Sequence, residues 1–192
     1  MRHRGGAVSL VIGYLDAPEH AVWMAGDGLV TFGCAQIEAL KVRAFFGGQL
    51  LVGTTGLHRL NNLVLDQYAP SLSPQAEDAY AFALRFSKGL RHVAKEAGVV
   101  TTGKEGQEDL GARVLVGYDG RLFGIASDFS VIEHAPWWAI GCGCESAEGA
   151  LAALDRLASP LRAPERLRFV LDLVASLDIH VGPPYTILRS PP

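Results

Sequence analysis

The sequence predicts an α+β fold in which two β-sheets pack face to face and helices cover their outer surfaces. The order of elements is the first observation: strand hairpins followed by two helical segments occur twice along the chain. The composition is the second, because 49% of the 192 residues are hydrophobic and only 19% are charged, which is typical of a globular chain. A chain of this length usually forms one domain, so we expect a single domain over residues 1–192.

Short apolar runs bounded by turn residues predict the strands of the first half. They cover residues 7–14, 21–27, 29–33, 41–46 and 49–54. Pro18 marks the turn between the first two strands, since proline fixes φ and lacks an N–H donor. We expect a tight turn at Gly26–Gly28 and a hairpin turn at Gly47 and Gly48.

Two helices are predicted after the second hairpin. Apolar residues recur at helical spacing from Leu57, and the first helix is expected to cover residues 57–69 and to end before Pro70. Ser73 followed by Pro74 is typical of a helix start, so the second helix is expected over residues 74–97. The polar, glycine-rich segment 99–111 predicts a loop.

The second half repeats this order of strands and helices. The Asp119-Gly120 pair predicts a two-residue hairpin turn between strands 112–116 and 122–126. Further along, we expect a strand at 137–141, helices at 145–158 and 163–174, and a last strand at 185–188.

Asp27 lies where a buried strand is expected to end, and a buried carboxylate needs a partner. Lys41 is the next cation along the chain and opens the following strand. We therefore expect a buried Asp27–Lys41 ion pair that faces the strand carrying Ala7 and Ser9. Taken alone, each residue has a plainer interpretation: Asp27 as a turn residue and Lys41 as a solvated charge at a sheet edge.

Five short motifs, in this order, resemble the superfamily of proteasome β-subunits and HslV-type peptidases. They are residues 25–33 (Ala-Gly-Asp-Gly-x-x-Thr-x-Gly), 41–43 (Lys-Val-Arg), 52–56 (Val-Gly-x-x-Gly), 138–143 (Trp-Ala-Ile-Gly-Cys-Gly) and 178–182 (Asp-Ile-His-Val-Gly). Each motif alone is weak, but together they span nearly the whole chain. The resemblance implies the four-layer αββα sandwich of the N-terminal nucleophile hydrolases.

The resemblance also implies roles for individual residues. In this superfamily the first residue of the mature chain attacks the peptide carbonyl, and its own α-amine or a nearby water acts as the base. Carried over, Asp27 orients Lys41, Lys41 activates the nucleophile, and the Gly53 N–H stabilises the oxyanion. Cys142 takes the position of a supporting serine, and Asp178 that of a supporting acid.

The nucleophile itself departs from the pattern, because no threonine precedes the first strand. Two registers are open: one places Ser9 at the nucleophile position, and the other places Ala7 there, which has no hydroxyl. Both residues are expected on the same face of the strand, since they are two apart. An amide nitrogen is not basic, so Ser9 needs removal of residues 1–8 before its own amine can act as the base.

Two classes of function therefore stay open. The first is a threonine/serine-type peptidase subunit of a ring-shaped, self-compartmentalised protease, which Asp27, Lys41 and Gly53 favour. The alternative is a non-catalytic homologue that forms a ring or binds peptides, which the absent threonine favours; a small-molecule amide hydrolase is a third, weaker interpretation. The resemblance implies a homo-oligomeric ring, peptides or unfolded proteins as substrates, and an ATPase unfoldase as a candidate partner.

Other partners and compartments are not indicated. The net charge of −3 gives no general reason to bind nucleic acid. No run approaches the ~18 apolar residues of a membrane helix, and the odd count of three cysteines favours the cytoplasm. Cys142 and Cys144 lack the second pair that a zinc site needs, and residues 98–104 lack the Ser/Thr of a phosphate loop. We expect neither a cofactor nor a metal.

Overall fold

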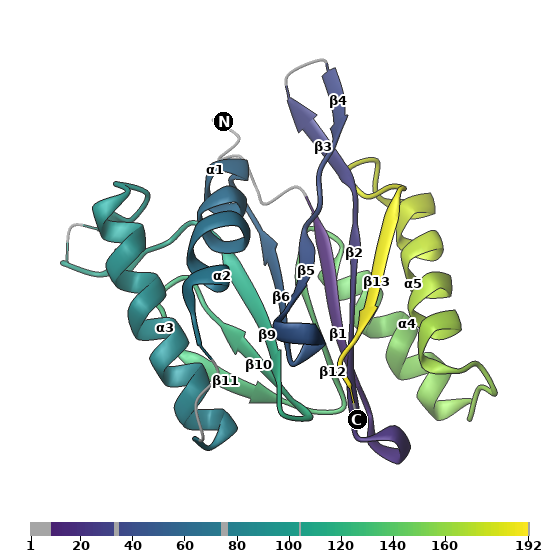
Figure 1. The fold of residues 1–192 in the computed structure, drawn as a ribbon. Helices are drawn as coiled ribbons and strands as arrows, with labels where there is room; N and C mark the ends of the chain where they lie inside the picture. The colour runs from purple at the N-terminus through teal and green to yellow at the C-terminus, as the bar shows by residue number, and fades with distance from the viewer. Residues whose placement is uncertain (1–8, 33–34, 74–76, 104, 192) are drawn as a thin grey trace.

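Two antiparallel sheets form the centre of the computed structural model, which describes residues 9–32, 35–73, 77–103 and 105–191 (Figure 1). The four-stranded sheet has the order β12-β1-β2-β13 and the five-stranded sheet the order β11-β10-β9-β6-β5. The first comprises β1 (Leu10–Asp16), β2 (Ala21–Asp27), β12 (Trp137–Gly141) and β13 (Tyr185–Arg189). The second comprises β5 (Val42–Phe45), β6 (Leu50–Thr55), β9 (Arg113–Tyr118), β10 (Arg121–Ile125) and β11 (Val131–His134).

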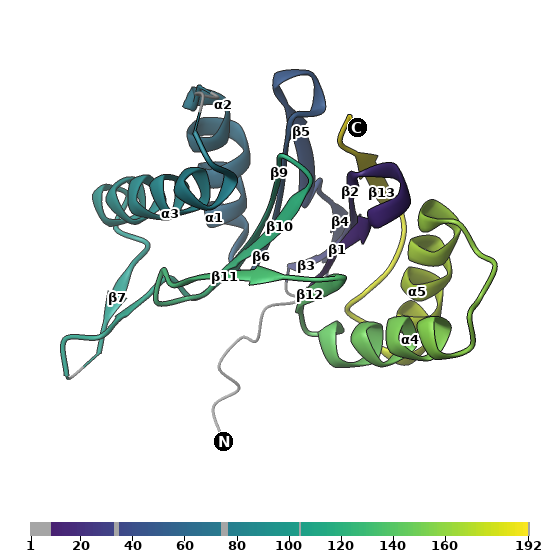
Figure 2. The ribbon, with the colours of Figure 1, turned by 90° about the horizontal axis from the view of Figure 1, so that it is seen from below.

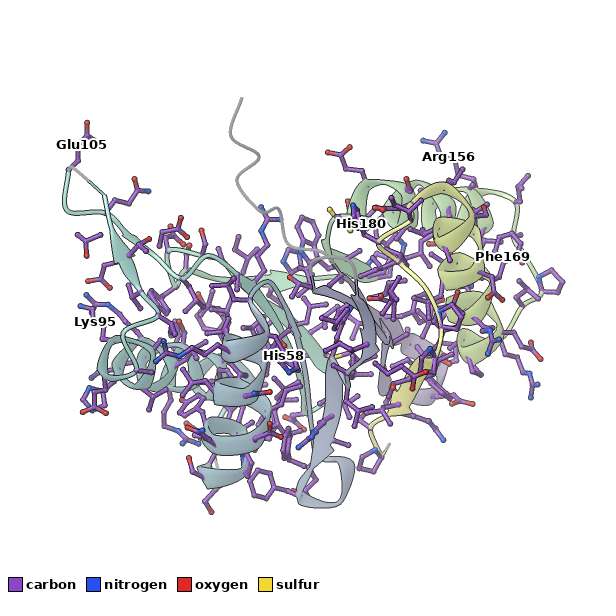
Figure 3. All side chains as sticks on the ribbon, turned by 90° about the horizontal axis from the view of Figure 1, so that it is seen from above. His58, Lys95, Glu105, Arg156, Phe169 and His180 are labelled. Carbon is purple, nitrogen blue, oxygen red and sulfur yellow. The ribbon has the colours of Figure 1, made fainter. Side chains whose placement is uncertain are left out.

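Helices cover the outer face of each sheet (Figure 2). The five-stranded sheet is covered by α1 (His58–Asn61), the π-helical segment η3 (Asn62–Tyr68), α2 (Ala69–Ser71) and α3 (Ala79–Glu96). The four-stranded sheet is covered by α4 (Cys144–Arg156) and α5 (Ala163–Leu177). Figure 3 places Arg156 and Phe169 on one outer side of the molecule and Lys95 on the other. The predicted four-layer αββα sandwich is confirmed.

Three apolar clusters hold the layers together. The cluster between the two sheets includes Val11, Met24, Leu51, Leu115 and Ile140, each at most 1% exposed. Two further clusters fill the space between each sheet and its helices. The central strands β1, β2, β6, β9 and β10 therefore bury most of both faces, which explains the high apolar content of a chain this small.

Several hairpins form as the turn residues predict. Asp119 (φ 49°) and Gly120 (φ 67°) connect β9 to β10 through a two-residue turn in which Tyr118 pairs with Arg121. Positive φ at both central residues is the geometry that Asp-Gly sequences favour. The second expected hairpin, between β5 and β6, turns through the 3₁₀ segment η2 (Phe46–Gly48).

The structure corrects the prediction of a tight turn at Gly26–Gly28. Strand β3 (Leu29–Phe32) pairs with β4 (Ala35–Glu38) and not with β2, because the two neighbours of β2 in the sheet are β1 and β13. The β3–β4 ribbon continues beyond the sandwich (Figure 1). Strand β4 was not predicted, and neither was β11.

Three further boundaries differ from the predictions. The first helical segment continues through Pro70 to Ser71, since a proline in the first turn of α2 gives up no intrahelical bond. Helix α3 begins at Ala79, where the Asp78 carboxylate accepts from the N–H groups of Tyr80 and Ala81.

The predicted loop at 99–111 carries a small ribbon, and residues 7–8 and 74–76 lie outside the described residues. The ribbon pairs β7 (Thr101–Thr102) with β8 (Glu108–Asp109), and the 3₁₀ turn η1 (Ala17–Glu19) joins β1 to β2.

No helix in the described parts of the chain is both long enough and apolar enough to cross a membrane.

Candidate active site

Asp27 is the last residue of β2, and its carboxylate lies at one end of the four-stranded sheet with 1% of the residue exposed. It accepts hydrogen bonds from the Leu10 N–H at 2.7 Å, the Lys41 Nζ at 2.8 Å and the Gly182 N–H at 3.4 Å. The three donors come from β1, from the start of β5 and from the segment before β13. Asp27 therefore joins three parts of the chain that are distant in sequence.

Lys41 is 4% exposed, and its ammonium group contacts Asp27 and also donates to the carbonyl of Leu29. The predicted buried ion pair is confirmed. An ammonium group has three donors, and these two contacts use two of them. The third remains for a further acceptor.

Burial and pairing act on this pair in opposite senses. Burial raises the pKa of Asp27, whereas the charge of Lys41 and the N–H donors of Leu10 and Gly182 lower it. Burial lowers the pKa of Lys41, and the Asp27 charge raises it. Burial is the larger influence on both groups, so on balance the pKa of Asp27 is raised and that of Lys41 is lowered. Each charge offsets part of the desolvation of its partner, and neither charge is expected to persist alone.

Ser9 precedes β1 and is 3% exposed. Its neighbour Leu10 donates to Asp27, and its own carbonyl accepts the N–H of Cys142 at 2.9 Å. Ser9 therefore lies between the Asp27–Lys41 pair and the start of α4. Ala7, the residue of the alternative register, lies outside the described residues.

Gly141 allows the chain to pass directly beside Ser9. It has a φ of +106°, and a Cβ added here would lie 2.0 Å from the Ser9 carbonyl oxygen. The same added atom would lie 3.2 Å from the Thr55 Cγ2 of β6. Only glycine fits between these groups, so the Ile-Gly-Cys-Gly segment is shaped around Ser9.

Cys142 and Asp178 complete this group of residues. Asp178 is the C-cap residue after α5, and its carboxylate accepts the N–H of His180, which Figure 3 labels in the segment leading to β13. Burial, with smaller contributions from the nearby carboxylates of Asp178 and Asp27, raises the pKa of the Cys142 thiol to about 11. Cys142 is therefore a neutral thiol at neutral pH, as suits a supporting group.

We expect the Cys142 thiol to react slowly with iodoacetamide at pH 8, because only the thiolate is nucleophilic. The alkylation rate should rise about tenfold per pH unit and level off only near pH 11. Peptide mapping after timed alkylation measures the rate at this position. A plateau near pH 8.5, the ordinary thiol value, would contradict the expectation.

Gly53 lies within β6 and faces the other sheet, where an added Cβ would lie 2.6 Å from the Val11 Cγ1. The Thr54 N–H donates to the Lys41 carbonyl, and hydrogen-bonding directions alternate along a strand. The Gly53 N–H is therefore directed toward its partner Leu115 in β9. This arrangement gives Gly53 a packing role between the sheets and offers no support for its assignment as the oxyanion donor.

Solved structures with the same architecture match this chain over most of its length. Thiobacillus denitrificans BPH in complex with epoxomicin is 24% identical with a TM-score of 0.78, covering 95% of this chain and 98% of that one. HslV from Trypanosoma brucei is 17% identical with a TM-score of 0.68, and the match covers 95% of this chain and 99% of that one. Anbu from Yersinia bercovieri is 18% identical with a TM-score of 0.68, and the match covers 95% of this chain and 81% of that one. The chain has the fold of the proteasome-like N-terminal nucleophile hydrolases.

The likeness lies in the structure, since no family model and no curated protein matches the sequence. At these identities it establishes the proteasome-like fold. Within that fold, four of the five motifs contribute side chains or backbone groups to one end of the four-stranded sheet. The residues brought together there are Ser9, Asp27, Lys41, Cys142 and Asp178.

Sequence patterns alone missed the backbone groups of this site. The Leu29 carbonyl and the N–H groups of Leu10 and Gly182 bind the ion pair, yet every residue carries such groups. Thr55 was also missed; it lies beside Gly141 at the end of β6. Its position after Gly53 in the Val-Gly-x-x-Gly motif was the one available signal.

Proposed function

We propose that this chain is an N-terminal nucleophile peptidase in which Ser9 attacks the peptide carbonyl after removal of residues 1–8. The observation that carries the proposal is the buried Asp27–Lys41 pair, which is bonded to the residue next to Ser9. Burying two charges is unfavourable unless they are well paired, and a purely structural sheet end can be filled with apolar residues. A site that must hold a cation beside a hydroxyl requires the pair.

The chemistry assigns one task to each group. The Lys41 ammonium, held by Asp27, lowers the pKa of the Ser9 hydroxyl by favouring its alkoxide. The freed α-amine of Ser9, with a pKa of about 8, accepts the hydroxyl proton as attack forms the acyl-enzyme bond, and it then protonates the leaving amine. Water next attacks the ester and regenerates the hydroxyl.

In this proposal, Cys142 holds Ser9 in position, and Asp178 supports Cys142. The Cys142 N–H holds the Ser9 carbonyl, and Gly141 lets the two segments approach closely. Burial, assisted by the carboxylates of Asp178 and Asp27, keeps the neighbouring Cys142 thiol protonated. The backbone around Ser9 is thus held by Cys142 on one side and by Asp27, through Leu10, on the other before a substrate binds, as catalysis by positioning requires.

Ser9→Ala should abolish hydrolysis of a fluorogenic peptide while leaving the melting temperature within about 1–2 °C, since one small polar group is lost. Intact mass should show the loss of residues 1–8 in active wild-type protein. Epoxomicin, which is bound in the similar BPH structure, should add its mass to the wild type and not to Ser9→Ala. A full-length mass together with no hydrolysis would contradict the peptidase and favour the non-catalytic alternative.

We also propose that the chain works as a homo-oligomer. Helix α5 exposes Phe169, Leu173 and Leu177 in a stripe at i, i+4 and i+8, with exposed fractions of 47%, 36% and 68%. Exposed apolar stripes are typical of protein–protein contacts, and an Anbu complex of Pseudomonas aeruginosa forms a helical assembly. Light scattering should give several times the chain mass of 20.5 kDa, and a monomer at micromolar concentration would contradict the proposal.

A further inference from the structure

Two adjoining cavities open beside the proposed nucleophile. The larger, here called the polar chamber, has a volume of about 460 Å³, and its lining includes Thr55, Gly141 and Cys142. The smaller, here called the apolar chamber, has a volume of about 170 Å³, and its lining includes Ile132 and Trp138. Arg113 and Ser127 line both, so the two chambers are neighbours.

The polar chamber holds a hydroxyl that lacks a partner. Thr55 is 4% exposed, and its Oγ1 makes no hydrogen bond within the described residues. Leaving a buried hydroxyl unsatisfied is unfavourable, so such a group usually has a function or an absent partner. Because Thr55 packs against Gly141, next to the Cys142 amide that binds Ser9, a bound peptide group is well placed to supply that partner.

The apolar chamber has the walls of a side-chain pocket. Ile125 and Ile140 are each 1% exposed, and Ile132 is 51% exposed at the rim. The rings of His134 and Trp138 stack with centroids 3.8 Å apart. Burial lowers the pKa of His134, so its ring is neutral at neutral pH, and the charged side chain of this lining is Arg113, which the two chambers share. The volume fits one aliphatic or aromatic side chain.

We propose that the two chambers form a substrate groove, in which Thr55 hydrogen-bonds the peptide backbone and the apolar chamber selects one apolar side chain near the cleaved bond. This inference rests on the proposed peptidase function, because that function supplies the occupant. It adds the substrate class: peptides that carry a Leu-like or Phe-like residue at one fixed distance from the bond that is cleaved.

Binding to the Ser9→Ala variant tests the groove without requiring hydrolysis. The probes are fluorescein-labelled octapeptides of Gly and Ser, each with a single Leu moved through the sequence, and fluorescence polarisation measures their Kd. One Leu position should bind about tenfold more tightly than the others, the typical discrimination of an apolar pocket. Adding Ile132→Asp should remove this preference, and adding Leu84→Asp, exposed on helix α3 and part of neither lining, should preserve it.

Thr55→Val provides a second readout on the same background. Valine keeps the shape and removes the unpaired hydroxyl, so the melting temperature should stay the same or rise. All peptides should nevertheless bind about fivefold more weakly, because the lost bond is to the backbone. A Leu preference that survives Ile132→Asp, unchanged binding in Thr55→Val, or no binding at all would overturn the groove. If wild type cleaves nothing while the predicted preferences hold, the peptidase proposal fails and the groove stands.

Discussion

Asp27→Asn is expected to lower the free energy of unfolding by about 3–5 kcal/mol, the usual effect of removing one partner of a buried ion pair. Lys41 would remain 4% exposed beside a neutral amide, and its charge would lose both the attraction and a strong acceptor. Urea denaturation of wild type and variant, extrapolated linearly to water, measures the difference. Peptide hydrolysis should be lost as well, since Lys41 would no longer be oriented.

Two variants make this result interpretable. Asp172→Asn breaks the exposed Arg168–Asp172 pair on α5, in which both side chains are more than half exposed, and should change stability by less than about 0.5 kcal/mol. Asp27→Asn combined with Lys41→Met removes both charges and should recover part of the lost stability while activity stays absent. Equal, small effects of Asp27→Asn and Asp172→Asn would mean that the pair is hydrated and not buried.

Gly141→Ala should destabilise the protein by on the order of 3 kcal/mol, the upper range for a strained backbone position. The backbone here has a φ of +106°, and the new Cβ would lie 2.0 Å from the Ser9 carbonyl oxygen. The neighbour is backbone and not a flexible side chain, so β12 must move away from β1. That movement breaks the Cys142–Ser9 hydrogen bond and should abolish activity.

Gly149→Ala is the matched control. Gly149 lies in α4, and an added Cβ meets no atom within 4 Å. Alanine favours the helix, so this variant should be about 0.5–1 kcal/mol more stable than wild type. Thermal unfolding of the two variants side by side separates the clash from a general effect of adding a methyl group. A Gly141→Ala protein as stable as wild type would show that the two segments are not in close contact.

Much of the fold follows from local sequence patterns. Asp119-Gly120 specifies its hairpin because aspartate and glycine tolerate positive φ, and the spacing of apolar residues predicts α3, α4 and α5. The same patterns missed β4, β11 and the β7–β8 ribbon, each four residues or fewer. Such short strands carry too few alternating residues for the period to stand out, and pairing with a neighbour stabilises them.

The Asp27–Lys41 pair is the contact of the site that the sequence alone predicts. A carboxylate at the end of a buried strand requires a cation, and Lys41 was the next one along the chain, so solvation physics predicted the contact. The sequence could not predict that Cys142 would bind Ser9 across 133 positions or that Gly53 would turn its N–H toward β9. These contacts depend on how closely the two sheets pack, and only the tertiary structure fixes that distance. The chambers beside Thr55 and Trp138 depend on the tertiary structure for the same reason, because strands of both sheets contribute to their lining.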